Sequence, residues 1–229
     1  MTEKHLCIAT NDFHVTHHQP FQTMVYLFCP VLISLFLLSC TRNYQVEQSL
    51  PTPIVEKLPL VSDIVITNDF STYIYSKEYE NGITYNVEIG KTQERMFTNL
   101  FNNLLSTVYV IREMPKFPLE DLKKDIVIKV TLDDFEVATP EENGLESHKV
   151  SVLYGLSVYT ADGKLLGNWK VPGYGRDRRN DFLPFEPVVE ATKEALRDAA
   201  TLVAAEFTSL PEIQATVCVK TKKPSQCRK

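Results

Sequence analysis

The chain has 229 residues, a formal net charge of −5 and a sequence pI of about 5.6. Hydrophobic residues make up 44% of the sequence, which suffices for a folded core. The net charge is mildly negative, whereas proteins that bind DNA or RNA usually have an excess of basic residues. We therefore expect a globular protein with no nucleic-acid partner.

The amino-terminal part contains an uncharged apolar run from Met24 to Ser39, MVYLFCPVLISLFLLS. It is shorter than the ~20 residues that a membrane-spanning helix needs, and it has the length of the apolar core of a signal peptide. The run ends in LLSC at residues 37–40, which resembles the lipobox of bacterial lipoproteins. That resemblance implies cleavage before Cys40, diacylglycerol on its thiol, acylation of the new amine with a palmitate-type chain, and a lasting membrane anchor.

The signal-peptide interpretation of residues 1–39 has two alternatives, a plain transmembrane helix and a cysteine that follows an apolar run by chance. Signal peptides begin with basic residues, yet Lys4 is the one lysine or arginine before Cys40, so residues 1–23 are a candidate misassigned start. The histidines at positions 14, 17 and 18 lie in that segment. They would be absent from the mature protein, so we expect no metal site from them.

The residues after the cysteine indicate where the protein goes and how it is divided. Thr41 stands where aspartate retains enterobacterial lipoproteins in the inner membrane, which favours the periplasmic face of the outer membrane. Prolines at 51, 53 and 59 interrupt regular structure and predict a semi-extended tether. The expected segments are a signal peptide at 1–39, a lipidated cysteine and tether at 40–60, a single periplasmic domain at 61–215 and a basic tail at 216–229.

Apolar periodicity predicts the elements of the domain. Strands are expected at 61–67, 70–79, 83–89, 108–112, 125–137, 149–160 and 165–171, and helices at 91–107 and 187–208. Asn-Gly at 81–82 and Asp-Gly at 162–163 are strong hairpin signals, and residues 125–171 are expected to form an antiparallel meander. We predict an α/β fold, a two-layer sandwich in which a mixed, mostly antiparallel sheet carries two helices packed on one face.

Three stretches carry a resemblance to a known group of proteins: TYNVEIG, LYGLSVYTADGKLLGNWKVPGYG, and ALRDAATLVAAEF followed by LPEI. From about Leu58 to Ala215 the pattern resembles a family of uncharacterised proteobacterial envelope lipoproteins. Its fold is similar to that of periplasmic accessory lipoproteins such as the lipopolysaccharide-assembly lipoprotein and the amino-terminal domain of the Tol-system propeller protein. The resemblance implies non-catalytic support of an envelope machine and transfers no catalytic residue.

Residues with catalytic chemistry are sparse in the mature domain. His148 is its one histidine, and without a G-x-S-x-G elbow an exposed loop residue is favoured over a catalytic base. The acidic pairs at 133–134 and 141–142 lie at a strand end and in a loop, as solvated surface acids do, and a carboxylate-pair hydrolase is the alternative. The sequence contains no HExxH, CxxC, EF-hand or Walker pattern. We expect no enzyme activity, no metal and no cofactor.

The segment GYGRDRRND at 173–181 is the candidate binding site. We expect a flexible loop in which Tyr174, Arg176, Arg178 and Arg179 contact a carboxylate, a phosphate or an acidic partner, because arginine binds such groups with a planar fork. The alternative is a solvated connector whose own aspartates neutralise the arginines. The tyrosines of the predicted strand 70–79 are core residues or, if the helix-free face of the sheet is open, a second contact patch.

Two cysteines remain in the mature chain once Cys40 carries lipid. Cys218 and Cys227 form an even pair in an oxidising compartment, which predicts a disulfide that closes a small loop in the tail. Two free thiols in a frayed terminus are the alternative.

These observations predict a non-enzymatic, outer-membrane-anchored periplasmic lipoprotein that serves as an accessory or scaffold of an envelope assembly or transport complex. Its expected partners are the membrane and an envelope protein. One alternative is a small-ligand or lipid-binding module that uses the uncovered sheet face, which a concave apolar pocket would favour. The other is a peptidoglycan hydrolase, which a cleft that gathers His148 with a serine or carboxylates would favour.

Overall fold

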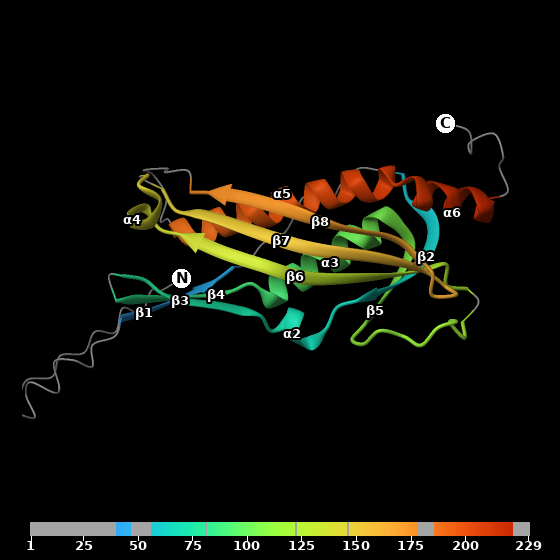
Figure 1. Ribbon diagram of the computed structural model, residues 1–229, viewed down its shortest axis with the longest axis horizontal. Helices are drawn as coiled ribbons and strands as arrows, with labels where there is room; N and C mark the ends of the chain where they lie inside the picture. The colour runs from blue at the N-terminus through green and yellow to red at the C-terminus, as the bar shows by residue number, and fades with distance from the viewer. Residues whose placement is uncertain are drawn as a thin grey trace, which may run out of the picture. The chain divides into compact units, whose positions relative to one another are not determined.

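The computed structural model describes residues 40–46, 56–80, 82–121, 123–145, 147–177 and 186–221. The chain divides into the compact units Met1–Cys40 and Thr41–Lys229, and the fold is that of the second unit. The elements (Figure 1) are β1 (Cys40–Gln45), β2 (Leu58–Val65), α2 (Asn68–Ser71), β3 (Ile74–Glu78), β4 (Ile83–Glu88), α3 (Gly90–Leu104), β5 (Leu105–Ile111), β6 (Ile126–Ala138), α4 (Pro140–Asn143), β7 (Lys149–Thr160), β8 (Leu165–Arg176), α5 (Pro187–Ser209) and α6 (Pro211–Thr221).

The main sheet has five strands in the order β5-β2-β6-β7-β8. Strand β2 is parallel to both β5 and β6, whereas β6, β7 and β8 are antiparallel neighbours. This confirms the meander expected over residues 125–171. The turn between β7 and β8 contains Gly163 with φ of 92°, a backbone conformation that the Asp-Gly turn predicts.

Helices α3 and α5 cover one face of this sheet, as predicted. From α3, Phe97 packs edge-on against Tyr154 of β7, with ring centroids 4.9 Å apart. From α5, the backbone lies directly on β8, because a Cβ atom built on Gly173 would stand 2.3 Å from the carbonyl oxygen of Ala195. In the sheet, Tyr154 pairs with Val171, two residues before Gly173, so both helices lie on the same side. The predicted two-layer α/β arrangement is confirmed.

A second sheet has three strands in the order β1-β4-β3, where the prediction has a single sheet. The expected strand 70–79 is interrupted because Thr67 caps the short helix α2, accepting a hydrogen bond from the Phe70 N–H. Strand β3 therefore begins at Ile74 and pairs with β4 as an antiparallel hairpin. The hairpin packs against β6 through Tyr75, whose ring lies 5.2 Å from that of Phe135.

The expected tether at 40–60 is wrong at both of its ends. Residues 40–45 form β1, and the next residue, Val46, is 3% exposed. The ring of Tyr44 packs edge-on against that of Tyr85, and the Asn86 side-chain amide donates to Asn43. Alternation of polar and apolar residues makes this segment a half-buried strand. Strand β2 likewise begins at position 58, and α6 continues to position 221, beyond the domain end expected at 215.

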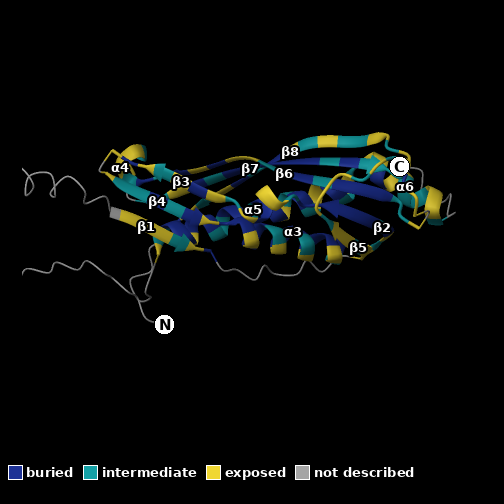
Figure 2. Cartoon of the chain, turned by 90° about the horizontal axis from the view of Figure 1, so that it is seen from below, coloured by how far each residue is buried: buried dark blue, intermediate teal, exposed yellow. Residues whose placement is uncertain are grey.

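The segment 112–125 crosses part of the helix-free face of the main sheet. Its Phe117 and Leu119 pack with Val65 of β2 and Val127 of β6 in a small apolar cluster. The neighbouring buried carboxylate of Asp63 forms an ion pair with Lys124, at 2.7 Å. The Asp125 carboxylate accepts from the Val61 N–H, also at 2.7 Å. Figure 2 shows the result: β2 and β6 are largely buried, whereas β5 carries exposed residues along its length.

Candidate functional site

The first residues of the expected binding loop lie in a strand. Residues 173–176 belong to β8 and remain paired with β7 up to the partners Lys149 and Arg176. The Tyr174 N–H donates to Asp198 and the Arg176 N–H to Glu194, each at 3.0 Å, so α5 fixes this backbone. The flexible-loop expectation is therefore wrong for residues 173–176. Arg178 and Arg179 lie outside the described residues.

Tyr174 nevertheless has the exposure expected of a contact residue, with 64% of its surface accessible. It borders a cavity of about 550 Å³ at the end of β8. The lining includes Lys149 and Arg176 as well as Glu136 and Glu194, so both signs of charge face the opening. The described part of the site thus differs from the cationic cluster that the sequence suggests.

His148 is more buried than an exposed loop residue, with 17% of its side chain accessible. It stacks on Tyr85, and its Nδ1 lies 3.8 Å from the buried carboxylate of Asp177. Burial lowers the pKa of His148, and this effect outweighs the attraction of Asp177, which raises it. Neutral histidine is therefore the favoured form, and its contacts are those of a packing residue at the strand end.

The tyrosines of the hairpin are mostly core residues. Tyr75 and Tyr79 are 7% and 5% exposed, and both hydroxyls reach the backbone of β6. The Tyr79 hydroxyl donates to the Val137 carbonyl at 2.6 Å, and the Val137 N–H donates to the Tyr75 hydroxyl at 3.4 Å. The Tyr75 hydroxyl in turn donates to Glu136 at 2.8 Å. The periodicity of the sequence offered these tyrosines as core residues, but it did not indicate which groups their hydroxyls bond to.

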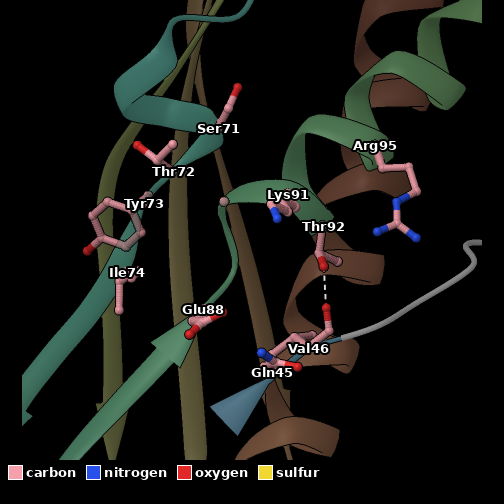
Figure 3. Close-up of a pocket in the computed structure, with 11 residues that line it drawn as sticks. Gln45, Val46, Ser71, Thr72, Tyr73, Ile74, Glu88, Lys91, Thr92 and Arg95 are labelled. Atoms are coloured by element: carbon pink, nitrogen blue, oxygen red, sulfur yellow. Dashed lines mark hydrogen bonds between the residues drawn. The ribbon is translucent and has the colours of Figure 1, made fainter. Parts of the chain in front are cut away.

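A groove of about 340 Å³ lies at the amino-terminal end of α3, between the small sheet and α2. Figure 3 shows Thr92, in the first turn of α3, pointing to Val46 at the end of β1, with Lys91 and Glu88 also lining the groove. The Thr92 hydroxyl donates to the Val46 carbonyl, which ties β1 to the helix. Gly90 permits the turn into α3, because a Cβ there would stand 2.4 Å from the carbonyl oxygen of Ser71.

The helix-free face of the main sheet is largely polar. The pairing register places on it Lys129, Thr131, Asp133, Asp134, Glu136, Ser151, Ser157, Asn168 and Lys170. Lys170 and Asp133 form an ion pair across this face. The cavity of about 550 Å³ lies at one end of this face, because Glu136, Ser151 and Tyr174 line it, and charged side chains stand at its border.

The cysteine predictions fall partly outside the described residues. The backbone of Cys40 begins β1, and its side chain is not described. Cys218 of α6 is disulfide-bonded, whereas Cys227 lies outside the described residues, so their pairing stays a prediction. In the described part of the chain no helix is long and apolar enough to cross a membrane. The same residues contain no group of histidine, cysteine, aspartate and glutamate that would hold a metal ion.

Comparison with known proteins gives structural neighbours without a family assignment. No family model and no curated protein matches the sequence. A Xanthomonas campestris protein described by the family model DUF330 is 11% identical, covers 80% of this chain and 99% of its own, and has a TM-score of 0.45. The lipoprotein GNA1162 of Neisseria meningitidis is 12% identical, with coverages of 54% and 88% and a TM-score of 0.31. A candidate lipoprotein of Caulobacter crescentus is 9% identical, with coverages of 58% and 84% and a TM-score of 0.33. At these scores the similarity assigns neither a family nor a function to this chain.

Proposed function

We propose that the chain is a lipid-anchored periplasmic accessory protein without enzyme activity, held on the outer membrane through Cys40. The observation that carries this proposal is the junction at Cys40. An apolar run that ends in LLSC precedes it, and a folded domain begins directly after it. Cleavage there would remove the signal peptide and leave every element of the domain in place.

The short connection determines how such a domain would work. Three residues separate Cys40 from Tyr44, whose ring is packed on Tyr85, and an extended strand rises about 3.4 Å per residue. The anchored residue, at the beginning of a strand of the small sheet, would therefore lie within about 14 Å of Tyr44. The domain would act close to the membrane surface, as an accessory protein that presents surfaces to neighbours.

A non-catalytic role fits the environment of the one mature-chain histidine. His148 is stacked on Tyr85 and faces Asp177, and burial keeps its pKa low. The carboxylate of Glu142 is likewise engaged, in the capping box that opens α4 and in an ion pair with Lys77. These contacts hold the end of the domain together, and they support a structural role for both groups.

The test is metabolic labelling of the full chain with a palmitate analogue in a bacterial host. We expect label on the wild-type protein, none on Cys40→Ala, and an uncleaved precursor of Cys40→Ala on a gel. Cys218→Ala is the matched control, because it removes a cysteine far from the junction, and it should label like the wild type. Labelled Cys40→Ala would contradict the anchor, and a mature protein recovered in the inner membrane would contradict the location.

A further inference from the structure

Among the residues that the structure describes, the main sheet ends at β5 on one side, and no further strand pairs with this edge, which is called the open edge below. The Ile111 carbonyl accepts from the Ile66 N–H, so Ile111 faces β2. Backbone direction alternates along a strand, which turns the N–H and C=O groups of Ser106, Val108 and Val110 away from β2. Within the described residues no hydrogen-bond partner is found for these outward backbone groups.

Side chains cap part of each of the other free edges of the main sheet. On β8, Asp198 and Glu194 accept from the outward N–H groups of Tyr174 and Arg176. Pro172 precedes Tyr174 by two residues and so faces the same side of the strand, and proline has no backbone N–H group. On the part of β6 that extends beyond its pairing with β2, the hydroxyls of Tyr75 and Tyr79 form hydrogen bonds with the N–H and C=O groups of residue 137. Natural sheets generally protect such edges, because unpaired backbone groups are templates for another strand.

Strand β5 and the last turns of α3 before it carry no charged side chain, and the charges nearest to the edge are Arg112, which follows the strand, and Lys124, whose Nζ lies 5.5 Å from the centre of the Tyr109 ring. No aspartate, glutamate, lysine, arginine or histidine occurs between Met96 and Ile111, in a protein whose residues are 23% charged. On β5 itself, Tyr109 and Val110 are 51% and 39% exposed. The strand is thus a seven-residue run of strand-forming side chains, LSTVYVI, without the charge or proline that usually guards an edge.

We propose that β5 is a strand-pairing interface for a second copy of this chain. An antiparallel pair about a two-fold axis near Val108 sets Thr107 opposite Tyr109 and Ser106 opposite Val110, and joins two five-stranded sheets into one. A self-pair of this kind opposes no like charges, because the strand and the adjoining turns of α3 carry none. A charged partner strand, by contrast, would find no complementary charge among the side chains of β5 itself, and only Lys124 lies against one of them, Tyr109.

The experiment is thiol crosslinking of the full chain in membranes. Thr107 is exposed on β5, so Thr107→Cys is treated with a short flexible bis-maleimide and resolved by mass on a gel. We expect a species of twice the monomer mass that is absent from the wild type, whose other cysteines give the background. Adding Val110→Lys should abolish this species, because a lysine on the edge resists strand pairing.

Matched variants on the opposite edge serve as controls. Leu165 on β8 is 49% exposed. Leu165→Cys should give no species of twice the monomer mass, and Leu165→Lys combined with Thr107→Cys should retain it. The proposal is overturned if Thr107→Cys gives no crosslink, if the product has another mass and so contains a different protein, or if Val110→Lys leaves the product intact. Light scattering of the wild-type protein in detergent gives an independent outcome: a dimer that dissociates on dilution supports the proposal, and a monomer at all concentrations overturns it.

Discussion

The two edge strands of the main sheet, β8 and β5, differ in whether their outward backbone N–H groups have hydrogen-bond partners. Helix α5 lies along β8 and places Asp198 and Glu194 on its outward N–H groups. Strand β5 has exposed apolar side chains and no such cap among the described residues. The sequence predicts a strand at both places, and the difference between the two edges lies in what the rest of the chain packs beside them.

The largest effect is expected where α5 contacts β8. A Cβ on Gly175 would stand 2.0 Å from the carbonyl oxygen of Ala191, so Gly175→Ala must push the helix off the strand. Overpacking of this kind costs about 1–3 kcal/mol, and we expect the upper part of that range from urea unfolding. Gly167→Ala is the control, because its nearest contact is an ordinary 3.5 Å to Trp169, and it should change stability by less than ~0.5 kcal/mol. Equal losses in the two variants would contradict direct helix-on-strand packing.

Removing the Tyr79 hydroxyl, which bonds to the backbone of β6, should have the next largest effect on stability. Tyr79→Phe keeps the ring and removes the hydroxyl that donates to the Val137 carbonyl, leaving a buried acceptor without its partner. The expected loss of unfolding free energy is on the order of 1–3 kcal/mol, measured by thermal or urea denaturation. Tyr174→Phe removes a hydroxyl from an exposed ring and should leave stability nearly unchanged. A neutral Tyr79→Phe would mean that β6 does not depend on this hydroxyl.

Removing the carboxylate caps should make β8 behave like β5. Asp198→Ala with Glu194→Ala frees two N–H groups at an exposed edge, where water replaces the caps, so we expect a stability loss below about 1 kcal/mol. The informative result is association: in this background Tyr174→Cys, which lies in the uncapped part of β8 and is exposed, should gain a crosslinked species of twice the monomer mass. Continued absence of that species would show that the body of α5, rather than its carboxylates, protects the edge.

The smallest effect concerns His148, which directly precedes β7 and accepts a backbone hydrogen bond from Asp177, the residue that directly follows β8. Burial lowers its pKa below the unfolded value of about 6.5, so near that pH the unfolded chain binds more protons than the folded one. The contribution of His148 to stability is thus present above pH ~6.5 and is lost as pH falls through the folded pKa. His148→Gln should have a flatter stability profile than the wild type below pH 6.5. A difference of the opposite sign would mean that Asp177 outweighs burial.

Much of the main sheet could be predicted because its signals are local. The alternation over residues 149–160 matches β7 residue for residue, and the helix expected at 187–208 differs from α5 by one residue at its end. Apolar periodicity also placed both helices on one face, which Tyr154 and Gly173 confirm through their contacts with α3 and α5. These features follow from the order of residues along one element.

The parts that could not be predicted depend on contacts between distant segments. Residues 173–176 contain two glycines and two exposed side chains, which suggest a loop, yet carboxylates from α5 hold them in a strand. Residues 41–46 follow the lipid-anchor motif and suggest a tether, but Tyr44 packs on Tyr85 of the small sheet and the Val46 carbonyl accepts from Thr92 of α3. Likewise, no local pattern shows that Tyr75 and Tyr79 close the edge of β6.

Residue-resolved amide hydrogen exchange, recorded at low and high protein concentration, tests the contrast between the two edges most directly. The outward N–H groups of Tyr174 and Arg176 should be protected at both concentrations, because Asp198 and Glu194 accept from them within one chain. The outward N–H groups of Val108 and Val110 should exchange rapidly in the dilute protein and become protected on concentration. Protection of Val108 and Val110 in the dilute monomer, or its absence at every concentration, would contradict an open edge that pairs with a second copy.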